Sequence, residues 1–100
     1  MIEVKVQSYQ DIISFLEVKG HADSAPHGED LVCAAVSAII TGGCNAIHEV
    51  NKFEIKLEEG YALIKAKGNV TRADALVLET ILKQLETIED SYPQYIRIRK

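Results

Sequence analysis

Apolar and polar residues alternate in four stretches of this chain, 1–7, 51–58, 61–67 and 94–100, and a fifth stretch, 12–19, is rich in the branched and aromatic residues that favour strands. Strict alternation predicts strands, because side chains two positions apart share one face of a strand. Apolar residues spaced three to four apart predict two helices, over 29–50 and 71–90. The order ββαββαβ predicts an α/β protein of the layered α+β type, with two helices packed on a mostly antiparallel sheet.

The first predicted helix has two features that need a tertiary explanation. Val32 and Val36 lie on its apolar arc, and Cys33 lies on the border between that arc and the polar side. Gly42-Gly43 inside the helix costs about 1 kcal/mol per glycine relative to alanine. We expect another backbone to approach closely at this pair; the alternative is a break in the helix.

The second predicted helix carries its own start and stop signals. Thr71 and Asp74 have the spacing of an N-terminal cap in which each side chain bonds the other residue's backbone. Ser91-Tyr92-Pro93 ends the helix, because proline cannot continue it.

Composition and charge narrow the class of protein. One hundred residues, 47% of them hydrophobic and 26% charged, indicate one folded domain over residues 1–100. The net charge of −4 disfavours nucleic acid as a partner, since phosphate binding needs a basic surface. We interpret the basic cluster Arg97, Arg99 and Lys100 as a solvated strand edge and tail.

The sequence predicts a cytoplasmic protein with free thiols. No stretch reaches the ~18–20 apolar residues that span a membrane, and the alternating N-terminus does not have the pattern of a signal peptide. Cys33 and Cys44 in one helix would lie about 16 Å apart at 1.5 Å per residue. That distance excludes a disulfide, which needs Cα atoms within about 7 Å.

The candidate chemistry lies in a histidine and a cysteine separated by a loop rich in glycine and proline. His21 follows the second predicted strand, and Gly20 lets the backbone turn sharply before it. Cys33 lies near the start of its helix, where unpaired N–H groups favour anions such as a thiolate. An imidazole beside a thiolate forms a base and nucleophile pair. The plainer interpretation is a buried core cysteine and a surface histidine.

Three neighbouring residues are further candidates for the site, and two of them admit two roles each. His27 is a rival base, but it lies in a loop that would hold it poorly. Asp30 has the position either of a third catalytic residue that orients the histidine or of a helix cap, and the two fit equally well. The Ser37 hydroxyl is placed to meet the thiol or substrate, or to bond back to its own helix.

The remaining ligand-type residues do not predict a metal or cofactor. Cys44 and His48 have the i,i+4 spacing of two ligands, but zinc usually needs three or four. Gly42-Gly43-Cys44 lacks the lysine and hydroxyl residue that complete a phosphate-binding loop.

The run Gly20-His21-Ala22, followed by the segment 28–37, resembles the ribosomal-processing cysteine protease family, Prp. The similarity continues through Asn45-Ala46 and the order of elements. It implies a homodimeric cysteine endopeptidase that removes a short N-terminal extension from a large-subunit ribosomal protein.

The resemblance also implies roles for individual residues. His21 matches the catalytic base and Cys33 the nucleophile. Asp30 and Ser37 match supporting positions of the same motif. The segment that contains Gly20, Ala22 and Gly28 matches a loop that contacts the substrate.

Two other classes of function stay open at this point. One is a non-catalytic ribosome-associated or protein-binding module in which Cys33 is merely packed. The other is a redox-sensing thiol protein, which the absence of a nearby resolving cysteine disfavours. The predicted partners are a ribosomal protein peptide and a second copy of the chain, with no direct contact to nucleic acid or membrane.

Overall fold

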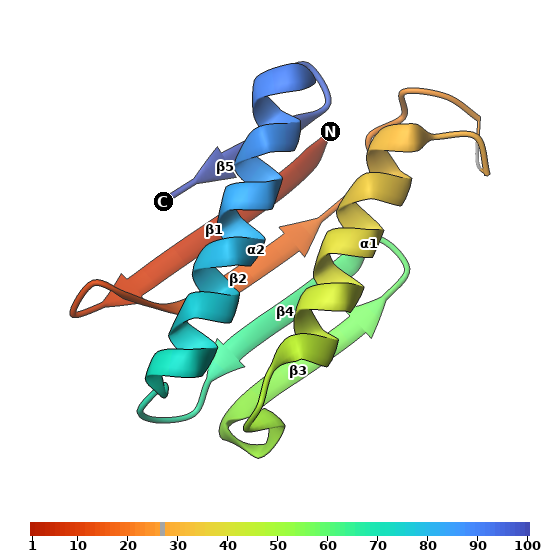
Figure 1. Ribbon diagram of the computed structural model, residues 1–100. Coiled ribbons are helices and arrows are strands. Elements are labelled where there is room, and N and C mark those ends of the chain that lie inside the picture. The colour runs from red at the N-terminus through yellow and green to blue at the C-terminus, as the bar shows by residue number, and fades with distance from the viewer. Residues whose placement is uncertain (27) are drawn as a thin grey trace.

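A five-stranded sheet and two helices form two layers in the computed structural model, which describes residues 1–26 and 28–100 (Figure 1). The strands are β1 (Ile2–Tyr9), β2 (Ile12–Lys19), β3 (Phe53–Glu58), β4 (Tyr61–Ala66) and β5 (Ile96–Arg99). The helices are α1 (Leu31–Ala46) and α2 (Arg72–Ser91), and a single 3-10 turn, η1 (Val50–Lys52), precedes β3. Both helices cover the same face of the sheet, which confirms the predicted fold class and order. Within the described residues, neither helix has the length and apolar character needed to cross a membrane.

The strand order is β3-β4-β2-β1-β5. Only the β1–β5 pair is parallel; the other three pairs are antiparallel. In the β2–β4 register Lys19 faces Tyr61, so the residues just beyond both strands also meet. The Gly20 N–H donates to the Gly60 carbonyl oxygen at 2.9 Å. The chain that leaves β2 therefore lies beside the β3–β4 turn, although about forty residues separate them.

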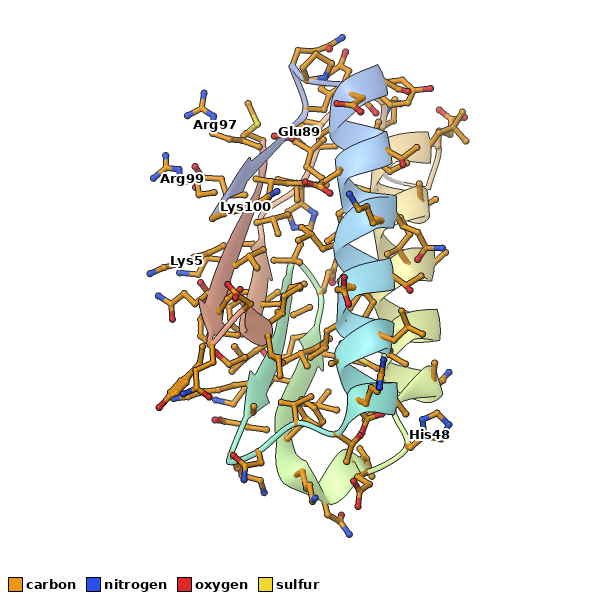
Figure 2. The ribbon with its side chains drawn as sticks, turned by 60° about the vertical axis from the view of Figure 1, so that its left-hand side comes forward. Lys5, His48, Glu89, Arg97, Arg99 and Lys100 are labelled. Atoms are coloured by element: carbon orange, nitrogen blue, oxygen red, sulfur yellow. The ribbon has the colours of Figure 1, made fainter. Side chains whose placement is uncertain are left out.

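The core lies between the helices and one face of the sheet. Eight large aliphatic side chains are at most 2% exposed: Ile2, Val4, Leu16, Ile64, Leu78, Ile81, Leu85 and Ile96. Their alternation along the strands follows the predicted period of two. The other face of the sheet is open, and Figure 2 shows Lys5, Arg97 and Arg99 pointing away from the helices.

Helix α2 also secures the edge strand β5. The Glu89 side chain accepts a hydrogen bond from the Ile98 N–H at 2.8 Å. This bond satisfies an N–H on the side of β5 that has no neighbouring strand. A single carboxylate on α2 thus replaces part of the missing strand partner.

Helix α1 is shorter at both ends than the predicted span 29–50. It begins after Asp30, which caps it, and it ends at Ile47, whose backbone turns to an extended conformation. The Ile47 side chain is buried, whereas Val50, placed on the predicted apolar arc, is 51% exposed outside the helix. The predicted C-terminal end is too late because a residue of α2 accepts hydrogen bonds from the backbone N–H groups that would have continued α1.

The acceptor is the buried carboxylate of Asp74. It accepts the N–H of His48 at 2.7 Å and the N–H of Glu49 at 3.1 Å. In a longer α1 these two N–H groups would bond to the carbonyls four residues earlier. The tertiary contact therefore replaces the next turn of the helix.

The predicted cap of α2 is half correct for the same reason. The Thr71 hydroxyl accepts the Asp74 N–H at 3.2 Å, as the spacing predicts. The Asp74 carboxylate, in contrast, is 1% exposed and bonds to the end of α1 instead of returning the bond to Thr71. The carboxylate therefore accepts hydrogen bonds from the end of α1 and not from the backbone of Thr71 at its own helix start.

Asp74 keeps its charge although it is buried. Burial alone raises the pKa of a carboxyl, but the backbone hydrogen bonds from His48 and Glu49 outweigh it and hold the pKa of Asp74 below its ordinary value. A lowered native pKa stabilises the fold at neutral pH, and that stabilisation is lost as the pH falls through the native pKa. Asp74 therefore joins the two helices most strongly above the acid range.

The glycine pair in α1 has a different explanation from the predicted backbone approach or break. The helix is continuous, and Gly43 packs against the side chain of Ile81 on α2. A Cβ on Gly43 would overlap Ile81, whereas a Cβ on Gly42 would meet nothing within 4 Å. Only one of the two glycines is required by packing, and its partner is a side chain.

We expect Gly43→Ala to destabilise the protein and Gly42→Ala to stabilise it. The Gly43 variant gains helix propensity but overpacks Ile81, for a net loss of about 1–2 kcal/mol. The Gly42 variant gains up to about 1 kcal/mol, because alanine costs less than glycine in a helix. Urea unfolding of both variants measures the difference. Equal stabilities would contradict the packing at Gly43.

Candidate active site

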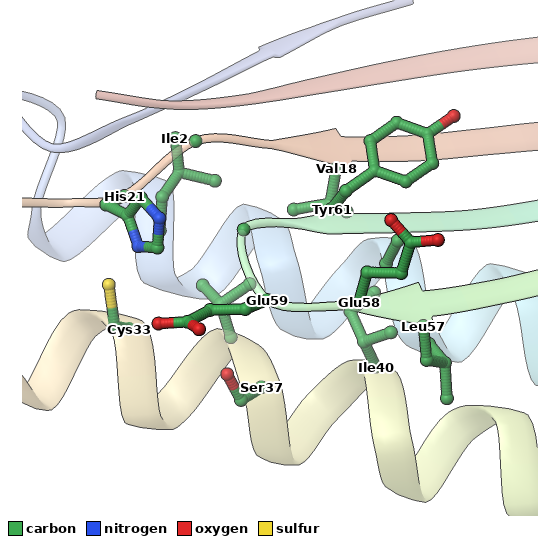
Figure 3. A pocket seen from close by; sticks show the side chains of 14 residues that line it. Ile2, Val18, His21, Cys33, Ser37, Ile40, Leu57, Glu58, Glu59 and Tyr61 are labelled. Atoms are coloured by element: carbon green, nitrogen blue, oxygen red, sulfur yellow. The ribbon is translucent and has the colours of Figure 1, made fainter.

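The segment after β2 carries His21 to the start of α1. Gly20 has φ +97°, and a Cβ there would lie 2.5 Å from the Met1 carbonyl oxygen, so this sharp turn requires glycine. The Met1 nitrogen donates to the His21 carbonyl oxygen at 2.7 Å. His21 is held by its backbone while its side chain stays exposed. Figure 3 shows the Cys33 sulfur pointing toward the His21 imidazole.

Cys33 is half-buried in the first turn of α1, on the border position that the helical phase predicts. Its Sγ accepts a hydrogen bond from the Ala22 N–H at 3.2 Å. Among the described residues, the thiol makes this bond to the backbone and none to the imidazole. Catalytic hydrogen bonds are often long before substrate binds. The two side chains can therefore act together although no direct hydrogen bond joins them here. Because Ala22 follows His21 in the chain, this bond holds the backbone next to His21 close to the sulfur.

Asp30 is the cap of α1, one of the two roles that the sequence left open. Its Oδ1 accepts the Cys33 N–H at 3.0 Å and the Ser24 hydroxyl at 2.5 Å, and its Oδ2 accepts the Ser24 N–H at 2.9 Å. The Ser24 hydroxyl and the Cys33 N–H lower the pKa of Asp30 well below its ordinary value, against a smaller effect of desolvation. Both carboxylate oxygens are engaged by the loop and the helix, and neither is bonded to His21.

Ser37 lies one helical turn after Cys33 and is exposed. Within the described part of the chain, its hydroxyl bonds neither back to its helix nor to the thiol. Figure 3 shows Ser37 on the same side of α1 as Cys33, facing the β3–β4 turn that carries Glu59. Its hydroxyl is therefore available to a bound molecule.

Two adjoining hollows share the residues around the thiol: His21, Cys33, Ser37 and Glu59. The first, of about 210 Å³, has apolar walls formed by Ile2, Val18, Val36, Ile40, Leu57 and Ala62. The second, of about 460 Å³, is lined by the loop residues Asp23, Ala25, Gly28 and Asp30. The thiol thus lies at the junction of two hollows that are both bordered by carboxylates, Glu58 and Glu59 in the first and Asp23, Asp30 and Glu59 in the second, and only the first has large apolar walls.

Three site residues were not predicted from the sequence: Ser24, Glu59 and Gly60. Ser24 lies in the predicted loop, and its bond to Asp30 has no signature in their spacing. Glu59 and Gly60 form the predicted turn of the second hairpin, but nothing local shows that this turn reaches His21. The pairing of β2 with β4 brings them there.

The other candidate residues lie elsewhere. Cys33 and Cys44 are both free thiols, as their helical separation predicts, and burial raises the pKa of Cys44. His48 lies 3.4 Å from the Asp74 carboxylate, measured from Nδ1, at the far end of α1. His27, the rival base, lies outside the described residues.

A thiol in the first turn of a helix, an exposed imidazole facing it and two adjoining hollows define a candidate cysteine-dependent hydrolase site. Residues 1–97 match the family model for the cysteine protease Prp. The chain therefore belongs to the family of ribosomal processing cysteine proteases.

Relatives of known activity and structure cover nearly the whole chain. The ribosomal processing cysteine protease Prp of Bacillus subtilis is 35% identical over 98% of this chain and 96% of its own length. That of Mycoplasma genitalium is 42% identical over 87% and 88%. The ribosomal processing protease Prp from S. aureus, solved with a covalently linked product peptide, superposes with a TM-score of 0.89. It is 31% identical and covers 99% of this chain and 98% of that one.

We expect iodoacetamide at pH 7 to modify Cys33 at least tenfold faster than Cys44. Cys33 opens onto both hollows beside a base, whereas Cys44 is buried with a raised pKa, and only the thiolate reacts. His21→Ala should slow the labelling of Cys33, and His48→Gln, a histidine control at the far end of α1, should not. Peptide mapping by mass spectrometry measures both rates. An unchanged Cys33 rate in the His21 variant would contradict the pairing.

Proposed function

We propose that this protein cleaves the N-terminal extension from a large-subunit ribosomal protein, with Cys33 as nucleophile and His21 as general base. The observation that carries the proposal is the Cys33 sulfur facing the His21 imidazole at the junction of the two hollows. The S. aureus relative has been solved with a substrate peptide and with a covalently linked product peptide, which supports a peptide as the substrate here. Ribosome maturation would place this activity in the cytoplasm.

The chemistry follows from the two side chains. His21 removes the thiol proton, and Cys33 Sγ attacks the scissile carbonyl carbon while the C=O electrons move to oxygen. His21 then returns the proton to the leaving amine as the C–N bond breaks, which leaves a thioester on Cys33. A water molecule that gives its proton to His21 attacks the thioester, and the acid product and the free thiol are released.

Two N–H groups in the first turn of α1 already have partners and are not free to bind the oxyanion. The Cys33 N–H is engaged by the Asp30 side chain, and the Ala34 N–H donates to the Asp30 carbonyl at 3.0 Å. The Ala22 N–H, 3.2 Å from Sγ, is a donor beside the reacting sulfur. We assign the Ala22 N–H to the developing oxyanion, where a donor of this kind contributes about 3–4 kcal/mol of transition-state stabilisation.

The two hollows suggest which substrate side chains bind near the scissile bond. The apolar walls around Val18, Val36 and Ile40 suit an apolar side chain, because burying it there removes apolar surface from water. The second hollow, with Asp23 and Asp30, does not suit an acidic one. Ser37 and Glu59 border both hollows and would contact the peptide between them.

A peptide that spans the junction between the extension and the mature ribosomal protein tests the proposal. Cys33→Ala should abolish cleavage, and His21→Ala should reduce kcat/KM at least about 100-fold, the usual contribution of a positioned base. Cys44→Ala and His48→Gln serve as matched controls and should cleave at nearly the wild-type rate. Replacing the apolar residue beside the scissile bond with aspartate should abolish cleavage by wild type.

Chromatography and mass spectrometry of the products give the rate and the bond that is cut. Cleavage by Cys33→Ala at the wild-type rate would exclude the proposed nucleophile. Tight binding of the peptide by wild type without cleavage would favour the alternative of a protein-binding module.

The proposed partner besides the substrate is a second copy of the chain. β3 and β5 are the edges of the sheet, and edge strands present backbone groups that can pair with another chain, although Glu89 already binds the Ile98 N–H of β5. We expect sedimentation velocity at micromolar concentration to give the mass of two chains. A single species with the mass of one chain would contradict the dimer.

A further inference from the structure

The turn between β3 and β4 packs directly against the imidazole of His21. A Cβ built on Gly60 would lie 2.7 Å from His21 Nε2 and 3.2 Å from Cε1. The same turn is tied to the residue before His21 by the bond from the Gly20 N–H to the Gly60 oxygen, at 2.9 Å. Figure 3 shows His21 above Cys33, with the β3–β4 turn that carries Glu59 beside the ring.

We propose that Gly60 is a positioning residue of the active site, which holds the His21 imidazole against Cys33 by the close approach of its bare backbone. The inference rests on the proposed function and adds a determinant of its rate. It assigns the role to a residue that touches neither the thiol nor the scissile bond and acts only through His21.

The distances determine the size of the effect. Non-bonded carbon atoms have their optimal contact at about 3.5–4.0 Å, so a side chain on residue 60 would displace the ring or the turn by roughly 1 Å. A misplacement of about 1 Å in a catalytic constellation can cost on the order of 100-fold in rate. The imidazole is exposed, and its outer edge yields more easily than the hydrogen-bonded turn. The ring is therefore the group that moves.

Backbone strain is a second reason for glycine at this position, and the two reasons can be separated. Gly60 has φ +72°, a conformation that alanine adopts only at a cost. Asparagine tolerates this left-handed conformation but still carries a Cβ. Gly60→Asn therefore relieves much of the strain and retains the collision with His21.

The experiment compares Gly60→Ala, Gly60→Asn and the control Gly68→Ala, whose Cβ would meet nothing within 4 Å. Far-UV circular dichroism confirms that each variant is folded. On the junction peptide, both Gly60 variants should lower kcat about 100-fold with little change in KM, and the control should match wild type. Recovery of kcat in Gly60→Asn, or wild-type kcat in Gly60→Ala, would overturn the proposal.

Alkylation of Cys33 gives a readout that does not need the substrate. Gly60→Ala should slow iodoacetamide labelling of Cys33 in the wild-type background and leave it unchanged in the His21→Ala background, because the effect passes through the imidazole. Slowing that persists without His21 would overturn the proposal. If wild type fails to cleave the peptide, the proposed function is wrong. The labelling rates of the two single variants and the double variant still test whether Gly60 acts through His21.

Discussion

The antiparallel pairing of β2 with β4 is the constraint on which the active site depends. It aligns the ends of two strands that are far apart in the chain, so that Gly20 and Gly60 share a hydrogen bond. His21 leaves the sheet at that point and has the β3–β4 turn on one side and the start of α1 on the other. The same alignment supplies Glu59 to both hollows. A shift of this register by one residue would turn the core side chains to the wrong face, so the buried face also protects the geometry of the site.

The loop between β2 and α1 is organised by its own polar groups. Asp30 binds Ser24 through both oxygens and at the same time caps the helix that carries Cys33. The Ala22 N–H closes the loop on the sulfur. The nucleophile Cys33 and the described loop residues Ala22, Ser24 and Asp30 thus form one hydrogen-bonded unit, which favours precise positioning of the thiol. This unit leaves the Ser37 hydroxyl and the His21 ring open to a peptide.

Local patterns predicted the elements well and their ends less well. The span of β2 follows from its branched and aromatic residues, and the order of the helices and strands follows from periodicity together with the turn residues between them. The C-terminal end of α1 and the cap of α2 were wrong in part for one shared reason, the buried carboxylate of Asp74. Gly43 shows the same limit, since its partner Ile81 lies on the other helix. Each error arises where a contact between distant segments outweighs a local preference.

The sequence by itself determined the layered fold, the free thiols and the two residues proposed for catalysis. The fold follows from the spacing of apolar residues, and the free thiols follow from the distance between Cys33 and Cys44 along one helix. The two proposed catalytic residues belong to a motif contained in one short stretch. Only the tertiary structure decided that Asp30 is a cap with Ser24 as its partner, and that Glu59 and Gly60 belong to the site. The physical reason is that a side chain's partner is chosen by proximity in space. For Ser24 and Asp30 the loop conformation creates that proximity, and for Glu59 and Gly60 it is the pairing of β2 with β4, which no local pattern encodes.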